Sequence, residues 1–380
     1  MRVSAPPSSS VAGAPAEVDD GVPDLETVPR KLGRPSLEQA PGDPRRFVVG
    51  TLVAAATLLL GVLAFDVVVD PWGQIGTGLF PSLIPTDRPV KAGLIDRLAE
   101  APQLIIFGSS RALKINPSYL QAKLGQPGFN AGVSDGEPED AWAFLNLIHS
   151  RFPKAHPHFL YMLDVEAFRG TPNPGVLDTP QLARYIPFGQ RWLARAHGIL
   201  PLLSWKGVGA SRRVFRRTVF GNGIPLRNTV FTANGFRIVD SHDIARASGS
   251  TLADQLRSSE ALYSWVYHAL YHRLSATQKS YFERTLAKMD AWGEPPVIVL
   301  TPIHPAMRAV LGPLGWNVRH RQVLAYLDAL SKRYRFTLLD MTSLSSFGGS
   351  PRLFYDGFHL TIPNMHRLLD TLVRKEHRAL

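Results

Sequence analysis

Three residues far apart in the chain have the side-chain types that together carry out acyl transfer. Ser110 follows the apolar run 104–108 in the block Phe-Gly-Ser-Ser-Arg, where a glycine turn leads from a strand pattern toward a helical start. Asp356 and His359 lie three residues apart near the other end of the chain. A serine hydroxyl attacks an ester carbonyl when a histidine takes its proton and a carboxylate orients that histidine. Each block alone is common in loops, but together they predict a Ser–His–Asp site.

The segments that must position these residues alternate between short apolar runs and helical patterns. Strands are predicted over 104–108, 128–130, 159–164, 296–301 and 336–341. Such alternation predicts an α/β fold with a parallel sheet and helices on both faces. Because sites on such sheets lie at the carboxyl ends of the strands, the serine and the Asp/His pair are expected to meet there. An insertion at about 170–290 begins with Pro/Gly-rich loops and ends in a helical pattern.

The order Gly-x-Ser near the start and Asp-x-x-His near the end resembles the SGNH (GDSL-like) hydrolase superfamily, over about 100–165 and 295–375. The resemblance implies a flavodoxin-like three-layer sandwich with five parallel strands in the order 2-1-3-4-5. It also implies that Ser110 is the nucleophile, His359 the base and Asp356 its orienter. The form Gly-Ser-Ser-Arg behind one N-terminal span is similar to the exported branch. That branch includes alginate O-acetylation and teichoic-acid D-alanylation proteins, which work beside membrane acyltransferases.

Two further blocks supply oxyanion donors in this family, and the chain departs from the second. Segment 129–136 resembles the first, so the N–H of Gly136 is the expected donor beside that of Ser110; an offset of one residue would make it the N–H of Asp135. After the third strand the family has a donor Asn, where this chain reads Leu-Asp-Val-Glu at 163–166. An ionised carboxylate cannot donate a hydrogen bond. Losing one donor typically costs about 3–4 kcal/mol of transition-state stabilisation.

Four more residues are expected to line the substrate site: Arg111, Asp164, Glu166 and His304. Either carboxylate can pair with Arg111, and that pairing is expected to be structural more than substrate-binding. His304 follows the fourth strand and should reach the same edge of the sheet. The aromatic residues of 256–292, among them Tyr263, are interpreted as core, with a sugar-stacking platform as the alternative.

The N-terminal part predicts a membrane anchor. Residues 1–46 are rich in Ser, Pro, Ala and Gly, which predicts a disordered tail. Residues 47–68 contain 19 uncharged residues from Phe47 to Phe65, which is long enough to span a hydrocarbon core. Basic residues precede this run and acidic ones follow it, so the positive-inside rule predicts a cytoplasmic tail and an extracytoplasmic domain over 69–380.

Composition narrows the chemistry further. The chain has no cysteine, which excludes disulfides and thiolate catalysis. The His-x-His pair at 156 and 158 offers too few ligands for a metal site, so neither a metal nor a cofactor is expected. The net charge of +11 suits an anionic polysaccharide or lipid head groups, or is a basic surface without a dedicated partner. No nucleic-acid-binding motif is present, so a nucleic-acid partner is not expected.

These observations lead to one expected function and one rival. The expected protein is a membrane-anchored serine esterase or O-acyltransferase acting on a cell-envelope glycan, with a membrane acyltransferase as a possible partner. The rival is a catalytically weak or inactive protein on the same scaffold that binds glycan or a membrane partner. The absent Asn favours the rival, whereas the intact Ser/His/Asp set argues against it.

Overall fold

The computed structural model describes residues 43–71, 79–80, 87–170, 174–177, 179–192, 204–221, 230–239 and 241–376. The chain forms two units, Met1–Ala55 and Ala56–Leu380. The first unit is described only from residue 43, so the predicted disorder of 1–46 falls almost wholly outside the described residues. The second unit contains the whole α/β fold.

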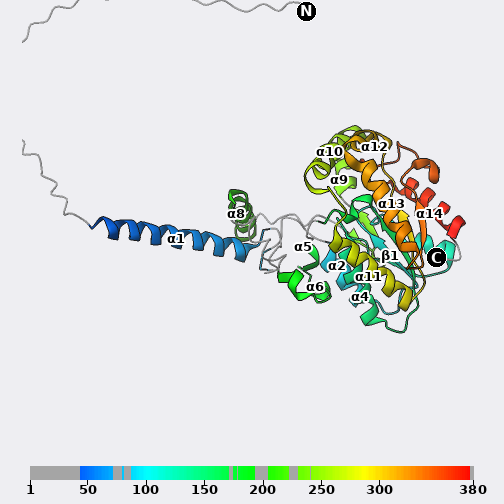
Figure 1. The fold of residues 1–380 in the computed structure, drawn as a ribbon, viewed down its shortest axis with the longest axis horizontal. Coiled ribbons are helices and arrows are strands. Elements are labelled where there is room, and N and C mark those ends of the chain that lie inside the picture. The colour runs from blue at the N-terminus through cyan, green and yellow to red at the C-terminus, as the bar shows by residue number, and fades with distance from the viewer. Residues whose placement is uncertain are drawn as a thin grey trace, which may run out of the picture. The chain divides into compact units, whose positions relative to one another are not determined.

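A five-stranded parallel sheet lies at the centre of the second unit, with helices around it (Figure 1). Its strand order is β2-β1-β3-β6-β7. In chain order this is 2-1-3-4-5, as expected. The strands are β1 Leu104–Gly108, β2 Gly128–Asn130, β3 His158–Leu163, β6 Val297–Leu300 and β7 Thr337–Asp340. Each lies within one or two residues of its predicted range, because short apolar runs bounded by Gly, Pro and polar residues mark buried parallel strands well.

Helices cover both faces of this sheet and give the fold three layers. Alternate strand residues such as Ile105 and Phe107 join one buried cluster, and Leu104 and Ile106 join another. The first cluster is closed by α2 Arg88–Asp96, α4 Pro138–Arg151, α11 Ala276–Trp292 and α13 Asn317–Ser331. The second is closed by α3 Pro117–Leu124 and α14 Ile362–Glu376. The period-two alternation of strand side chains therefore fills two separate cores.

Local sequence signals explain where these helices begin and end. The Asn116 side chain accepts a hydrogen bond from the Ser118 N–H, Pro117 takes the first helical position, and Gly125 closes α3 at φ 76°. These residue types are typical of the start and the end of a helix. Helix α4 begins with a capping box between Glu137 and Asp140.

The insertion contains more structure than its loops suggest. It holds α5 Pro174–Leu177, α6 Pro180–Ala183, α8 Trp205–Val219, α9 Ser241–Ala247, α10 Leu252–Trp265 and a two-stranded antiparallel sheet of β4 Val230–Phe231 and β5 Arg237–Val239. A π-helical turn, Val266–Leu270, extends α10. The hairpin was not predicted, since its strands are only two and three residues long. The buried Lys91 of α2 ties it to the main sheet by donating to the carbonyls of Asn130 and Gly235, both at 2.5 Å.

The remaining elements follow β3, β6 and β7. They are the 3-10 turn Val165–Phe168, α12 Pro305–Leu311, the π-helical turn Gly312–Trp316 and the 3-10 turn Leu344–Ser346. Helix α1, Pro44–Val69, comes before the α/β fold in the chain, and among the described residues it is the one helix long and apolar enough to cross a membrane. It begins three residues before the predicted span and so includes Arg45 and Arg46.

Candidate active site

Ser110 lies in a tight turn directly after β1. Gly108 ends the strand at φ 148°, where a Cβ would come within 2.7 Å of the Met162 carbonyl. A side chain at this position would therefore clash with β3. The predicted helical start is instead a run of turns, in which the N–H groups of Ala112 and Leu113 donate to the carbonyls of Ser109 and Ser110. These turns hold Ser110 at the carboxyl end of the sheet.

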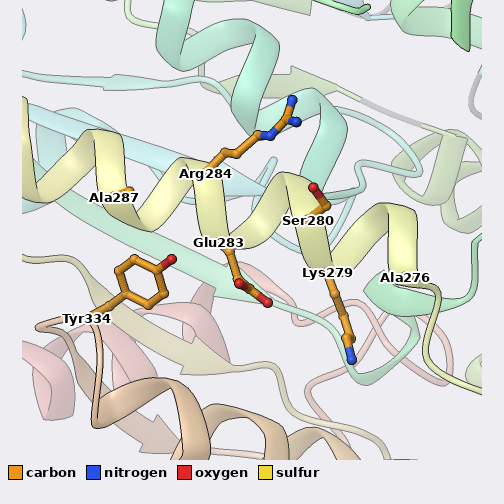
Figure 2. A pocket seen from close by; sticks show the side chains of 7 residues that line it. All are labelled: Ala276, Lys279, Ser280, Glu283, Arg284, Ala287 and Tyr334. Carbon is orange, nitrogen blue, oxygen red and sulfur yellow. The ribbon is translucent and has the colours of Figure 1, made fainter. Parts of the chain in front are cut away.

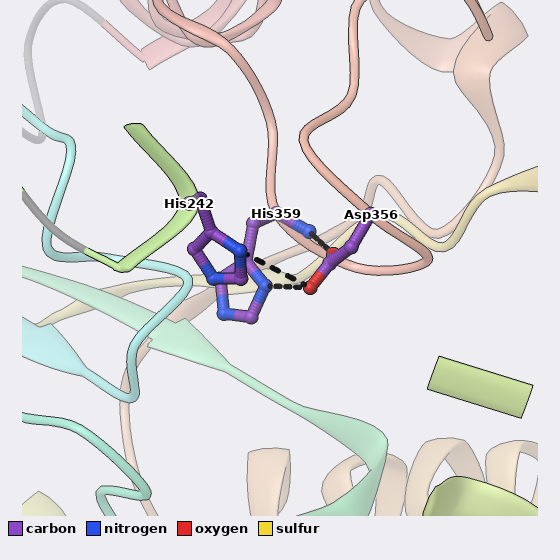
Figure 3. Close-up of side chains that lie close together, drawn as sticks. All are labelled: His242, Asp356 and His359. Carbon is purple, nitrogen blue, oxygen red and sulfur yellow. Dashed lines mark hydrogen bonds and ion pairs between the residues drawn. The ribbon is translucent and has the colours of Figure 1, made fainter. Parts of the chain in front are cut away.

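The structure brings the three predicted side chains into one hydrogen-bonded chain. Ser110 Oγ lies 2.8 Å from His359 Nε2. His359 Nδ1 lies 2.8 Å from Asp356 Oδ2 (Figure 3). These distances fall within the range expected of a nucleophile, its base and the group that orients the base.

The loop that carries Asp356 and His359 is held by its own hydrogen bonds. The other carboxylate oxygen, Asp356 Oδ1, accepts the N–H groups of Phe358 at 2.7 Å and His359 at 2.8 Å. A bridge between Phe354 and Leu360 closes the loop at its base. The Asp-x-x-His spacing thus creates a turn in which the carboxylate holds both the backbone and the imidazole.

The electrostatics of this loop keep the carboxylate ionised. Burial by itself would raise the pKa of Asp356, but the neighbouring His359, His242 and the Phe358 N–H together hold that pKa well below its usual range. An ionised Asp356 fixes the proton of His359 on Nδ1 and leaves Nε2 as the acceptor facing Ser110.

The donors for an oxyanion differ from those predicted. The N–H of Ser110 has no hydrogen-bond partner among the described residues, as an oxyanion donor requires. The N–H of Gly136, by contrast, donates to the Val133 carbonyl at 3.1 Å. Gly136 is required for another reason, because a Cβ there would come within 2.6 Å of the Gly108 carbonyl. This glycine lets the 131–136 loop pack against the turn that carries Ser110. Its N–H is already hydrogen-bonded within that loop, so the structure does not place it as a free oxyanion donor.

A small polar pocket adjoins Ser110. Its volume of about 20 Å³ is room for one water-sized group. Tyr263, from α10 in the insertion, lines it together with Ser110. The remaining lining residues are Ser109, Arg111, Asp135, Gly136, Glu137, Asp164, Glu166, Ala167 and Arg169. The predicted residues Arg111, Asp164 and Glu166 are therefore brought to Ser110, whereas His304 is not among the residues that line this pocket.

Arg111 has the structural role that the sequence predicted. Its guanidinium contacts Glu166 at 2.8 Å, Asp164 at 3.5 Å and the Thr301 hydroxyl at 2.9 Å. It also stacks over the ring of Phe358, 4.5 Å from the centroid. Arg111 therefore links the ends of β1, β3 and β6 to the loop that carries His359.

His304 lies at the start of α12, and its backbone N–H donates to the Gly357 carbonyl in the loop that carries His359, at 3.0 Å. Its Nδ1 accepts the Ala306 N–H at 3.1 Å, and its Nε2 lies 3.1 Å from the Pro351 carbonyl. The side chain is the N-cap of α12. Burial lowers the pKa of His304, which is consistent with a neutral ring in this capping position.

Two residues at the site were missed because they belong to the insertion. His242, in α9, lies 3.7 Å from Asp356 by Nδ1 to Oδ2, and its ring centroid is 4.4 Å from that of His359 (Figure 3). His242, Asp356 and His359 have ligand atoms within 4.8 Å of one another, so this group could hold a metal ion. Tyr263 was assigned to an aromatic stripe, in which Tyr267 and Tyr271 are indeed buried. Neither His242 nor Tyr263 stands in a motif that distinguishes it.

A larger groove lies elsewhere, along α11 (Figure 2). It has a volume of about 320 Å³ and is lined by Ala276, Lys279, Ser280, Glu283, Arg284, Ala287 and Tyr334. Its carboxylate, Glu283, accepts the Tyr326 hydroxyl at 3.1 Å and lies 3.6 Å from Arg333. No histidine is available to activate Ser280 in this groove, so size alone does not make it the reactive site.

No protein-family model matches the chain. No curated protein matches it either. The interpretation of the site therefore depends on its geometry and on the motif resemblance.

Proposed function

We propose that the protein is a membrane-anchored serine esterase or O-acyltransferase that uses Ser110, His359 and Asp356. The observation that carries this proposal is the unbroken hydrogen-bonded chain from Ser110 Oγ through His359 to Asp356 at the carboxyl end of the sheet. His359 takes the Ser110 proton as Oγ attacks an ester carbonyl, and Asp356 stabilises the resulting imidazolium. The acyl group then passes from Ser110 to water in an esterase, or to a sugar hydroxyl in a transferase.

The oxyanion of this reaction fits the small pocket. The N–H of Ser110 is one donor, and we assign the Tyr263 hydroxyl the place of the absent Asn. Tyr263 lines the pocket, and its hydroxyl lies beside Arg111. Burial raises the pKa of Tyr263, so its hydroxyl keeps its proton at neutral pH and can donate. The N–H of Asp135, in a left-handed turn at φ 56°, is the other backbone candidate.

The pocket beside Ser110 has room for the oxyanion. A volume of about 20 Å³ accepts a carbonyl oxygen and sets no limit on the length of the acyl group. An acetyl ester is therefore chosen only as the simplest test substrate. The net charge of +11 suits an anionic polysaccharide of the cell envelope as the acceptor, and a membrane acyltransferase would be a suitable donor of acyl groups.

Helix α1 is proposed to anchor the domain outside the cytoplasm. The basic residues before the apolar run and the acidic residues after it favour an N-terminus inside. A reporter enzyme that is active only after export, fused after the last residue, should be active in cells. Activity of a cytoplasm-only reporter at the same position would contradict both the orientation and the envelope function.

A fluorophosphonate probe tests the reaction directly. The probe should label wild-type protein on Ser110, as located by mass spectrometry of the modified peptide, and should not label Ser110→Ala. The matched control is Ser109→Ala, which removes the neighbouring hydroxyl and should be labelled as well as wild type. Absence of labelling on Ser110 in folded protein would reject the serine-hydrolase mechanism.

A second function is favoured by a specific observation. The chain has carboxylates at Asp164 and Glu166 where the family has its Asn donor, and the Gly136 N–H is already hydrogen-bonded within its own loop. A weak or inactive protein that binds glycan or a membrane partner would tolerate both features. Binding of an anionic polysaccharide by protein that no probe labels would support this function instead.

A further inference from the structure

Two imidazole nitrogens converge on one carboxylate oxygen at the edge of the proposed active site. His359 Nδ1 lies 2.8 Å and His242 Nδ1 lies 3.7 Å from Asp356 Oδ2 (Figure 3). Both histidine side chains are partly open to solvent, at 20% for His242 and 16% for His359. The carboxylate itself is held in place by the N–H groups of Phe358 and His359.

We propose that His242, Asp356 and His359 form a binding site for a divalent transition metal of the zinc class. Two imidazoles and a carboxylate are ligands that Zn²⁺ accepts, with a fourth position left for water. Tetrahedral bonds of about 2.0–2.1 Å separate neighbouring ligand atoms by about 3.4 Å. The two separations from Asp356 Oδ2, 2.8 and 3.7 Å, lie on either side of that value. All three ligand atoms lie within 4.8 Å of one another, so rotation of the two imidazole side chains would be needed to bring them around one ion.

The metal would switch off the chemistry proposed above, and this consequence depends on the proposed function. A metal can bind Nδ1 of His359 only after the proton now bonded to that nitrogen has left. That proton moves through solvent to Nε2, with no net proton release. Nε2 then becomes a donor facing Ser110 and can no longer take the serine proton. The metal also occupies the carboxylate that stabilises the imidazolium. The ion thus acts as a reversible inhibitor and has no part in the reaction.

The binding claim is tested on the full chain carrying Ser110→Ala, which keeps all three ligands and removes any turnover. Titration with Co²⁺ should produce a visible absorption band typical of four-coordinate cobalt, which saturates at one Co²⁺ per protein. Addition of Zn²⁺ should displace the cobalt and remove the band. His242→Ala and His242→Gln in the same background should weaken binding at least tenfold. The matched control is His268→Ala, which removes an exposed histidine of the insertion.

The outcomes separate this proposal from the proposed function. Unchanged cobalt binding in both folded His242 variants would overturn the metal site, whatever the activity. If the site exists and the serine reaction does too, Zn²⁺ should inhibit ester hydrolysis, a chelator should restore it, and His242→Gln should resist inhibition. Metal binding in a protein that turns over no ester, with or without a sugar acceptor, and that no fluorophosphonate labels would support the site and reject the serine mechanism.

A second inference comes from α8, independently of the active site. This helix has four arginines and no acidic residue. Arg212, Arg213, Arg216 and Arg217 are all exposed. Trp205 at its start is 92% exposed, and Phe220 at its end is 71% exposed. Arginine and large aromatic side chains on one short helix are typical of segments that lie in the head-group region of a bilayer.

Contacts place this helix beside the end of the proposed membrane span. The ring centroid of Phe215 lies 5.5 Å from that of Phe65 in α1 and 5.9 Å from that of Phe80. Asp66, in the last turn of α1, is fully buried beside Ser211 of α8. We infer that α8 lies on the anionic bilayer surface at which α1 emerges, with its arginines toward the phosphate groups. The four positive charges of α8 and its contact with the end of the span both favour a surface that carries anionic phosphate groups.

The absence of cysteine allows this inference to be tested with one label. Gly209 is exposed on α8, with no atom within 4 Å of a Cβ built there, so Gly209→Cys can carry an environment-sensitive fluorophore. In full-length protein reconstituted into phosphatidylglycerol vesicles, emission should shift to the blue and be quenched by brominated lipid. Phosphatidylcholine vesicles, or Gln at the four arginines, should reduce both effects. The control is Ser331→Cys, at an exposed position of α13. A signal in phosphatidylglycerol equal to that of this control would overturn the inference.

Discussion

The candidate site joins two regions that are built differently. Ser110, Asp356 and His359 come from turns at the ends of a buried parallel sheet, whose strands are fixed by two hydrophobic cores. His242 and Tyr263 come from the insertion between β3 and β6, where elements are short and partly exposed. The sheet edge therefore supplies the proposed reacting groups in fixed positions, and the insertion supplies the residues around them. We therefore expect the proposed reaction to depend most on the residues of the sheet edge. The residues of the insertion should change its rate or its inhibition by smaller amounts.

Removing a reacting group from the sheet edge should have the largest effect. Ser110→Ala and His359→Ala should each lower kcat for a simple acetyl ester by about 10⁴-fold or more, since triad members act as a unit. Ser109→Ala should have little effect, because that hydroxyl only accepts the Arg111 N–H at 3.2 Å. Steady-state assays of the three variants check this. Equal activity of wild type and Ser110→Ala, on several esters and with a sugar acceptor present, would favour the binding protein.

Loss of the orienting carboxylate should rank next. Asp356→Asn should lower kcat by about 10³–10⁴-fold, less than loss of the base, because the carboxylate stabilises the imidazolium without taking its proton. The double variant with His359→Ala should be no worse than His359→Ala alone. Additive losses in kcat would show that Asp356 acts separately from His359 and would break the unit proposed for the sheet edge.

The sheet edge was predictable because its signals are local and redundant. Apolar runs such as 104–108 and 297–300 are typical of buried strands. The Gly-x-Ser block directly follows the first of these runs, and the Asp-x-x-His block lies in the loop between β7 and α14. Parallel topology then brings the blocks together without further information. Even here, the N–H of Gly136 was misassigned, since a one-residue difference in loop conformation decides which amide is available.

The insertion could not be predicted in the same way. The hairpin around Asn234 is too short to show a strand period, and it is held by the distant Lys91 through two carbonyls. His242 approaches Asp356 only because this hairpin and α9 fold back over the loop that carries His359. A contact between distant residues can be predicted from one sequence only when a motif marks both of them. No motif marks His242 or Tyr263, so neither residue could be assigned to the site in advance.

An intermediate effect is expected for the residue that the insertion contributes to the pocket. Tyr263→Phe should lower kcat by about 10²-fold with little change in KM, which is the usual cost of one oxyanion donor. The ring should keep its stacking on Phe358, 3.8 Å between centroids, so the loop should stay folded. Trp265→Phe, at an exposed neighbouring position, is the control and should behave as wild type. An unchanged kcat in Tyr263→Phe would show that Tyr263 has only a structural role. The sheet edge alone would then supply the groups that act in the reaction.

The smallest expected effect concerns the stability of the sheet edge itself. Burial alone would raise the pKa of Asp340, at the end of β7, but hydrogen bonds from His320 and Thr342 lower it from 3.8 to about 2. Because the folded-state pKa lies below the unfolded one, the ionised carboxylate stabilises the fold above about pH 4, and that contribution is lost as the pH falls toward 2. The side chain is 35% exposed, so solvent screening limits the contribution to about 1 kcal/mol.

This stability effect can be separated from catalysis by urea unfolding at two pH values. Asp340→Asn should lower the free energy of unfolding by about 1 kcal/mol at pH 6, and the difference from wild type should shrink near pH 2.5. Asp328→Asn, which removes an exposed carboxylate from α13, should match wild type at both. Activity at pH 7 should be retained in Asp340→Asn, because this carboxylate contacts none of the three reacting residues. An equal destabilisation at both pH values would mean that the charge on Asp340 contributes nothing and that packing alone holds this end of the sheet.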